Sequence, residues 1–134
     1  MDTEQGLIVP VIRDVDKKTI MQLSTELQEL AERTRERKVS LEEMQGGTFT
    51  ISNQGGIGSA QFTPIIYKPQ VAILGMGRGA EKLVVRKGKP AKRNLLPLGL
   101  SYDHRLIDGA NAARFMVDLV GALESFNESL MKAK

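Results

Sequence analysis

Residues 101–109 read Ser-Tyr-Asp-His-Arg-Leu-Ile-Asp-Gly, and this stretch says most about the fold of the chain. An apolar run at 95–102 leads into it and predicts a buried strand, and an amphipathic segment at 110–124 follows it and predicts a helix. The stretch is therefore a strand-to-helix corner that is dense in titratable side chains. Burying such side chains costs free energy unless each is paired, so the corner is either a structural ion-pair cluster or a functional site.

The rest of the chain predicts a mixture of helices and strands. Apolar or alternating runs predict further strands at 6–12, 48–52, 71–74 and 82–86, with a turn signal at 87–90. A helix is expected over 14–38, and the S-x-x-E pattern at 40–43 indicates a short helical turn that Gly46 and Gly47 end. Helices combined with at least five strands predict an α/β or α+β sandwich.

Helical spacing gathers apolar residues on one face of each expected helix. Asp14 or Asp16 is expected to cap the first helix, whose apolar face consists of Ile20, Leu23, Leu27, Leu30 and Thr34. The inward residues expected of the second helix are Ala112, Phe115, Met116, Leu119, Val120 and Leu123. Core packing is the expected role of both faces.

Composition excludes several classes of function. Of the 134 residues none is Cys and one is His, which excludes disulfides, a Cys nucleophile and any site that needs two histidines of one chain. One His and two Asp are a poor metal site, so no metal is expected. Net charge +3, 4% aromatics and no Trp argue against a nucleic-acid partner. No apolar run approaches the ~20 residues of a membrane span, and no signal peptide is visible.

Asn53 to Ser59 form a loop with three glycines directly after a predicted strand. The loop lacks both common phosphate-binding patterns, G-x-G-x-x-G with a following helix and G-K-[ST]. It is either a tight turn that needs positive φ or a place where glycines let a long ligand approach backbone amides. Ser52, just before the loop, is by itself a strand-end serine.

Four blocks together resemble a known family: GTFTISN at 47–53, FTPII at 62–66, QVAILGMG at 70–77 and, above all, DHRLIDG at 103–109. They resemble the catalytic domain of dihydrolipoamide acyltransferases, the E2 components of 2-oxo acid dehydrogenase complexes. GLIVPVIRDVDKK at 6–18 fits as well, so the resemblance covers essentially the whole chain.

The resemblance implies an α/β fold like that of chloramphenicol acetyltransferase, a mixed-sheet sandwich that is truncated here at its N-terminus. Residues 1–134 would be the C-terminal part of the catalytic domain, without lipoyl and partner-binding domains. The family assembles as homotrimers that build cubic or dodecahedral cores, with active sites between subunits. Implied partners are the lipoyl domain and the E1 and E3 components, and the implied location is the bacterial cytoplasm or the mitochondrial matrix.

The resemblance also implies roles for single residues. His104 matches the general base, Asp108 the acidic or amide position that supports the site, and Ser52 the hydroxyl that stabilises the oxyanion. Asp103 and Arg105 match a flanking charged pair with a structural role, and Asp2 matches an aspartate that pairs with an arginine near the start of the full domain. The cofactor-binding residues expected in the glycine-rich loop are Asn53, Gly55 and Gly56.

The implied reaction transfers an acyl group between dihydrolipoamide and coenzyme A, which is a substrate, with the lipoyl group supplied by a separate domain and no metal. FTPII and Ser52 resemble acetyl-transferring members, as in pyruvate dehydrogenase complexes. The alternative that stays open is a non-catalytic core or assembly module, or an inactive truncated fragment, that keeps the motif as a remnant.

Overall fold

The computed structural model describes residues 2–3, 6–127, 129 and 131. The chain forms two compact units, one of Met1–Thr48 with Glu124–Lys134 and the other of Phe49–Leu123. No helix in the described ranges is long and apolar enough to cross a membrane.

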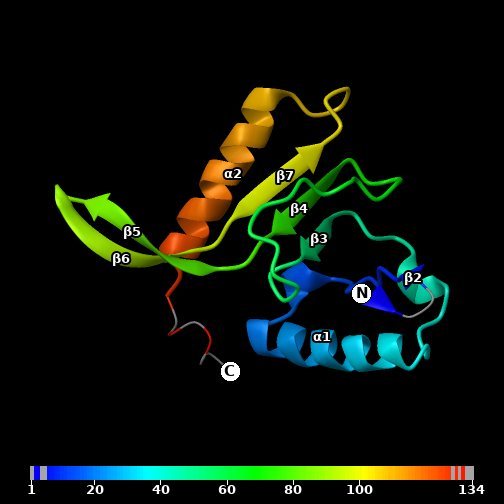
Figure 1. The fold of residues 1–134 in the computed structure, drawn as a ribbon. Helices are drawn as coiled ribbons and strands as arrows, with labels where there is room; N and C mark the ends of the chain where they lie inside the picture. The colour runs from blue at the N-terminus through cyan, green and yellow to red at the C-terminus, as the bar shows by residue number, and fades with distance from the viewer. Residues whose placement is uncertain (1, 4–5, 128, 130, 132–134) are drawn as a thin grey trace. The chain divides into compact units, whose positions relative to one another are not determined.

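The first unit is built around one amphipathic helix (Figure 1). Two short strands, β1 (Asp2–Thr3) and β2 (Gly6–Leu7), pair antiparallel before it, and the 3-10 turn η1 (Val15–Lys17) precedes α1 (Ile20–Arg35). Thr19 caps α1 in a capping box, in which its hydroxyl accepts from the Gln22 amide and the Gln22 side chain accepts from the Thr19 amide.

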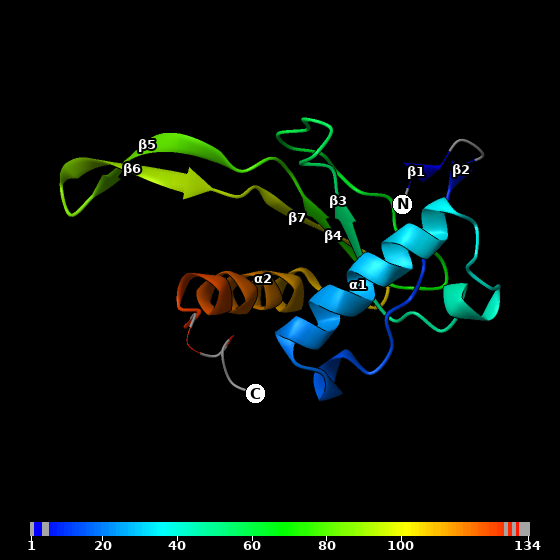
Figure 2. The ribbon, with the colours of Figure 1, turned by 90° about the horizontal axis from the view of Figure 1, so that it is seen from below.

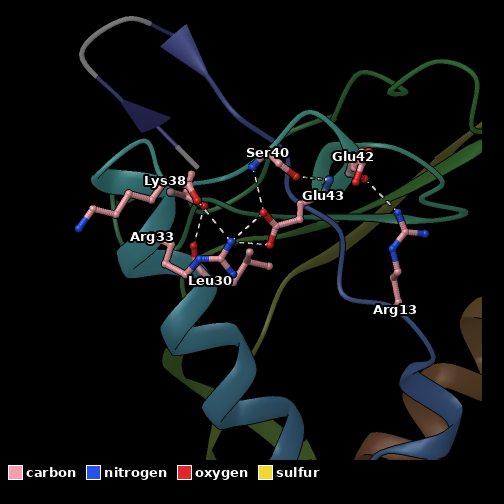
Figure 3. Close-up of polar contacts among 8 residues, drawn as sticks. Arg13, Leu30, Arg33, Lys38, Ser40, Glu42 and Glu43 are labelled. Atoms are coloured by element: carbon pink, nitrogen blue, oxygen red, sulfur yellow. Dashed lines mark hydrogen bonds and ion pairs between the residues drawn. The ribbon is translucent and has the colours of Figure 1, made fainter.

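A cluster of polar contacts ties the C-terminal end of α1 to the segment that follows it (Figure 3). The guanidinium of Arg33 donates to both carboxylate oxygens of Glu43, in the 3-10 turn η2 (Glu42–Met44), and to the Lys38 carbonyl. Ser40 and Glu43 bond each other reciprocally, as the S-x-x-E pattern predicts. Arg13 donates to the carbonyls of Glu42 and Gln45, so this part of the unit is held by side chains rather than by a sheet.

The second unit contains a three-stranded mixed sheet in the order β3-β4-β7. β3 (Thr50–Asn53) runs parallel to β4 (Ala72–Met76), and β7 (Leu98–Tyr102) runs antiparallel to it. The first four residues of β4 are buried, as a central strand requires. α2 (Gly109–Glu124) then runs back beside β7, and the ring of Phe115 lies 6.0 Å from that of Phe49 (Figures 1 and 2).

An antiparallel hairpin of β5 (Ala80–Arg86) and β6 (Lys89–Leu95) connects β4 to β7 and projects away from the sheet (Figures 1 and 2). Lys87 and Gly88 form its turn, both with positive φ. The hairpin leaves and re-enters the sheet at the C-terminal end of β4, the same end at which β3 finishes.

Several expected elements have different limits. The strand expected at 6–12 is confined to Gly6–Leu7, and 95–102 is divided, because its first residue ends β6 and β7 begins only at Leu98. The cap expected at Asp14 or Asp16 is wrong. Asp14 is left-handed, at φ 51°, and Lys18 is extended, so the α-helix begins only after Thr19.

The helix also ends earlier than 38, because Arg37 takes a left-handed φ of 59° that stops it. Of the expected apolar faces, Leu30, Thr34 and Ala112 are buried. The expected inward residues Ile20, Leu27, Phe115, Val120 and Leu123 are wrong, since each is more than a third exposed.

Replacing Thr19 with Ala removes the hydroxyl of the capping box, and we expect a loss of about 1 kcal/mol in the free energy of unfolding. Thr25→Ala is the matched control, because Thr25 is an exposed mid-helix residue and Ala is the better helix former, by about 0.5 kcal/mol. Urea unfolding of the two variants beside the parent measures both. Equal effects of the two substitutions would contradict the capping role.

Candidate functional site

Ser52 occupies the next-to-last position of β3. The residues directly opposite one another across the three strands form a row, and the row of Ser52 contains little side-chain volume. The register places it opposite Gly75, which in turn lies opposite Gly99. Residues directly opposite one another point to the same face of a sheet, so the Ser52 hydroxyl emerges beside two glycines. That hydroxyl is half-exposed and makes no hydrogen bond to any other described residue.

The segment 61–64 covers this face of the sheet. A Cβ at Gly75 would lie 3.0 Å from the Phe62 ring and 3.1 Å from Pro64, and one at Gly99 would lie 3.4 Å from the Phe62 carbonyl oxygen. The glycines of the Ser52 row therefore make room for a chain segment that crosses the sheet. The same segment forms one wall of an open pocket of about 390 Å³, and β7 contributes Gly99, Leu100 and Ser101.

Ser101 is a polar residue of this face that sequence reasoning did not assign to any role. It lies in the row of Ile73 and Thr50, and its hydroxyl oxygen is buried with no hydrogen-bond partner. Thr50, in contrast, donates from its hydroxyl to the Gln70 side chain at 2.6 Å. No signal in the sequence separates these two hydroxyls, because the difference depends on what the cross-strand neighbourhood supplies.

The glycine loop, residues 53–59, folds tightly onto the chain that leaves β4. Gln54 donates to the Met76 carbonyl, the Asn53 side chain accepts from the Gly55 amide, and Ser59 donates back to Gln54. A Cβ at Gly55 would lie 2.9 Å from the Gly77 carbonyl oxygen. Asn53 and Gly55, expected to bind a cofactor, are thus bonded within the loop, whereas nothing lies within 4 Å of the Cβ position of Gly56.

Arg78, in the segment that follows β4, contacts the glycine loop. Its amide donates to the Ser59 carbonyl at 2.7 Å and its Nε donates to the Gly55 carbonyl at 3.2 Å. Just before it, a Cβ at Gly77 would come within 2.3 Å of the Ala60 carbonyl oxygen. Gly77 and Arg78 therefore hold the glycine loop against the C-terminal end of β4.

At the other end of the sheet, Asp103 organises the turn after β7. Its amide donates to the Val71 carbonyl, and its own carbonyl accepts from Leu106 and Ile107. Its carboxylate accepts from the Arg105 amide and forms a two-pronged pair with the Arg105 guanidinium. The hydrogen bonds from the Arg105 side chain lower the pKa of Asp103 to about 2.

His104 lies between these two paired residues and is exposed. It makes no hydrogen bond to another described residue, and its ring lies 5.6 Å from that of Tyr102. Its Nε2 is 3.8 Å from the Cβ position of Gly109, the first residue of α2. The turn therefore presents an imidazole with both nitrogens available.

Asp108 caps α2 rather than contacting the His104 ring. Its carboxylate accepts from the Asn111 amide at 2.8 Å and from the Asn111 side chain at 2.7 Å. The capped helix fixes the end of the turn that carries His104. Asp2 belongs to β1, but its side chain lies outside the described residues. The described residues contain no cluster of three potential metal ligands.

β3 and β7 end at opposite ends of the sheet (Figure 1). Ser52, near the end of β3, and His104, just after β7, therefore lie at opposite ends of the sheet of one chain. Ser52 is two strands away from β7 and three rows away from Tyr102. With a rise of about 3.3 Å per residue and about 4.8 Å between strands, the Cα atoms of Ser52 and Tyr102 are about 14 Å apart. His104 follows in the turn beyond that end, so one chain does not bring this serine and this histidine together.

Comparison with known proteins places the chain in a family. Residues 1–131 match the family model of the 2-oxoacid dehydrogenases acyltransferase catalytic domain. The chain belongs to this family. The acyltransferase fold expected from the resemblance is thereby confirmed, together with its mixed sheet.

Among the relatives of this chain is the dihydrolipoyllysine-residue acetyltransferase component of the pyruvate dehydrogenase complex of Haemophilus influenzae. It is 46% identical over 131 residues, which are 98% of this chain and 23% of the relative. A solved dihydrolipoamide acetyltransferase of Azotobacter vinelandii is 49% identical with a TM-score of 0.89, over 97% of this chain and 53% of that one.

The solved cubic core of a pyruvate dehydrogenase multienzyme complex is 48% identical with a TM-score of 0.90, over 98% of this chain and 54% of that one. The chain thus spans about half the length of these solved relatives and about a quarter of the Haemophilus protein.

Acid is expected to open the turn that carries His104. The folded pKa of Asp103, about 2, lies below the unfolded value of about 3.9, so the pair with Arg105 stabilises the turn fully above pH 4 and is lost as the pH falls through 2. An NMR titration of the Asp103 carboxyl should give a midpoint near 2, and Arg105→Met should move it toward 3.9. An unchanged midpoint in that variant would show that Arg105 is not the cause.

Ser101→Ala is expected to leave the free energy of unfolding within about 0.5 kcal/mol of the parent, or to raise it, because the buried hydroxyl that it removes has no partner. Thr50→Val is the matched substitution, on the same face, and should cost about 1 kcal/mol because the bond to Gln70 is lost. Urea unfolding of both compares them. A larger loss for Ser101→Ala than for Thr50→Val would reveal a partner for Ser101.

Proposed function

We propose that this chain is the C-terminal part of an acyltransferase catalytic domain that moves an acetyl group between dihydrolipoamide and coenzyme A. The observation that carries the proposal is the DHRLIDG turn, which presents an exposed His104 with no hydrogen bond to the described chain, on a framework of the family fold. The Haemophilus relative is the acetyltransferase component of a pyruvate dehydrogenase complex and the Azotobacter relative is a dihydrolipoamide acetyltransferase, which favours acetyl over other acyl groups.

The roles of single residues are supported by one relative. A serine, a histidine and an asparagine have been investigated for their part in the catalytic mechanism of the Azotobacter enzyme, with the histidine 52 residues after the serine and the asparagine four residues further on. Ser52, His104 and Asp108 have the same spacing in this chain. Asp108 differs by carrying a carboxylate, and both aspartate and asparagine cap helices well.

In the proposed reaction His104 is the general base. A thiol of pKa about 8.5 is mostly protonated at neutral pH, and neutral imidazole accepts its proton as attack begins. The thiolate sulfur of coenzyme A forms a bond to the acyl carbon, and the Ser52 hydroxyl donates to the resulting oxyanion. When the bond from that carbon to the dihydrolipoyl sulfur breaks, His104 returns the proton to the leaving sulfur.

The geometry requires two copies of the chain for one such site. Because Ser52 and His104 of one chain lie at opposite ends of the sheet, they act on one substrate only if different copies supply them. A trimer that builds a larger core meets this requirement, and a relative forms the cubic core of its complex. The lipoyl domain and the E1 and E3 components are then the partners, with coenzyme A near the open side of Gly56.

The test follows thioester formation from acetyl-coenzyme A and dihydrolipoamide in the full assembled protein. His104→Ala should abolish transfer, and Ser52→Ala should lower kcat about a hundredfold with little change in KM. Mixed in equal amounts and reassembled, the two variants should recover about a quarter of the parent rate, since one neighbouring pair in four combines an intact His104 with an intact Ser52.

Two controls make the mixing experiment decisive. Reassembled alone, His104→Ala should stay inactive and Ser52→Ala should keep about 1% of the parent rate, and the oligomer mass of every sample should equal that of the parent. Failure of the mixture to recover activity would place Ser52 and His104 in one chain's site and overturn the two-copy arrangement. A parent protein that assembles without any transfer activity would favour the alternative, a non-catalytic core module.

A further inference from the structure

We propose that Arg78 is a positioning residue for Ser52, and that it acts through the hydrogen bond from its Nε to the Gly55 carbonyl rather than through its charge. The effect on catalysis rests on the proposed function of Ser52, whereas the contact with the glycine loop does not.

Arg78 bonds the glycine loop at both of its ends. Its amide donates to the carbonyl of Ser59, where the loop returns, and its side chain donates to the carbonyl of Gly55, where the loop departs. Between these two points the guanidinium lies against the loop, since its Nη2 is 3.5 Å from the Cβ position of Gly58. Gly58 has a φ of +95°, so a side chain there would strain the backbone.

The loop matters for Ser52 because few bonds hold the end of β3. Ser52 pairs with β4 opposite Gly75, and Asn53 and Gln54 follow at the last positions where β4 still offers partners. Beyond them the loop bonds to itself, from Ser59 to Gln54 and from Gly58 to Gly55, and to Arg78. Releasing Gly55 therefore lets the strand end fray from β4, and the Ser52 hydroxyl moves with it.

Arg78 differs in this respect from the cations of the hairpin that it precedes. Lys82, Arg86, Lys89 and Arg93 are exposed, and none of their side chains bonds another described residue. The register sets Lys82 opposite Arg93 and Arg86 opposite Lys89. Those side chains are solvated charges, whereas Arg78 is directed by two hydrogen bonds onto one loop. Arg86 therefore serves as the matched control.

Two substitutions separate the hydrogen bond from the charge. The side-chain amide nitrogen of Gln stands at the same distance along the side chain as Nε of Arg, so Arg78→Gln keeps the donor and removes the charge. Arg78→Met has a similar length but removes both. Arg86→Met makes the same chemical change on the hairpin, where no loop is held.

Amide hydrogen exchange in the full assembled protein measures the loop directly. In Arg78→Met the amides of Gly58 and Ser59 should exchange about tenfold faster than in the parent, whereas Arg78→Gln should stay within about threefold and Arg86→Met should not differ. Assays of acetyl transfer should show kcat reduced about tenfold in Arg78→Met with KM nearly unchanged, and largely restored in Arg78→Gln.

Each outcome decides one part of the proposal. Equal acceleration of exchange in the Gln and Met variants would show that the charge holds the loop, and no acceleration in either would show that Arg78 does not hold it. Faster exchange with unchanged kcat would overturn the positioning of Ser52 alone. If the parent protein transfers no acyl group, the proposed function fails, and the exchange rates still decide whether Arg78 holds the loop.

Discussion

The pairing of β4 with a strand on each side is the constraint on which the second unit depends. β4 is the one strand of this sheet that bonds two partners, and its first four residues are buried. Its register with β3 fixes the position of Ser52 along the sheet, opposite Gly75. Its register with β7 fixes the point at which the chain leaves the sheet toward His104. A shift of one residue in either ladder would turn the paired side chains to the other face.

From that register follows the separation of the two residues proposed to act in catalysis. Because β3 is parallel and β7 antiparallel to β4, the C-terminal end of β3 and the C-terminal end of β7 point in opposite directions. Ser52 comes just before one of these ends and His104 just after the other. The same local topology that places each residue well for chemistry keeps them apart within one chain, so assembly becomes part of the proposed mechanism.

In the second unit, glycines occupy several positions where two chain segments approach each other closely. Gly75 and Gly99 allow the segment 61–64 to lie on the sheet, and Gly55 and Gly77 allow the glycine loop to lie against the end of β4. The sequence offered the glycines at 55–58 as a possible ligand-binding loop. The contacts show that Gly55 packs against backbone, whereas the space beside the Cβ position of Gly56 is open. A glycine in a sequence does not show whether backbone, a side chain or a ligand fills the space beside it.

The sequence by itself determined the elements that depend on local physics. The S-x-x-E turn, the hairpin turn at Lys87-Gly88 and the corner between β7 and α2 follow from capping, positive φ and hydrophobic period. Only the tertiary structure decided what depends on distant partners: that Ser101 lacks a partner where Thr50 has one, and that Arg78 bonds the loop after Ser52. The physical reason is that a donor and its acceptor can lie far apart in the chain, and nothing in the local pattern records which pairs the fold will bring together.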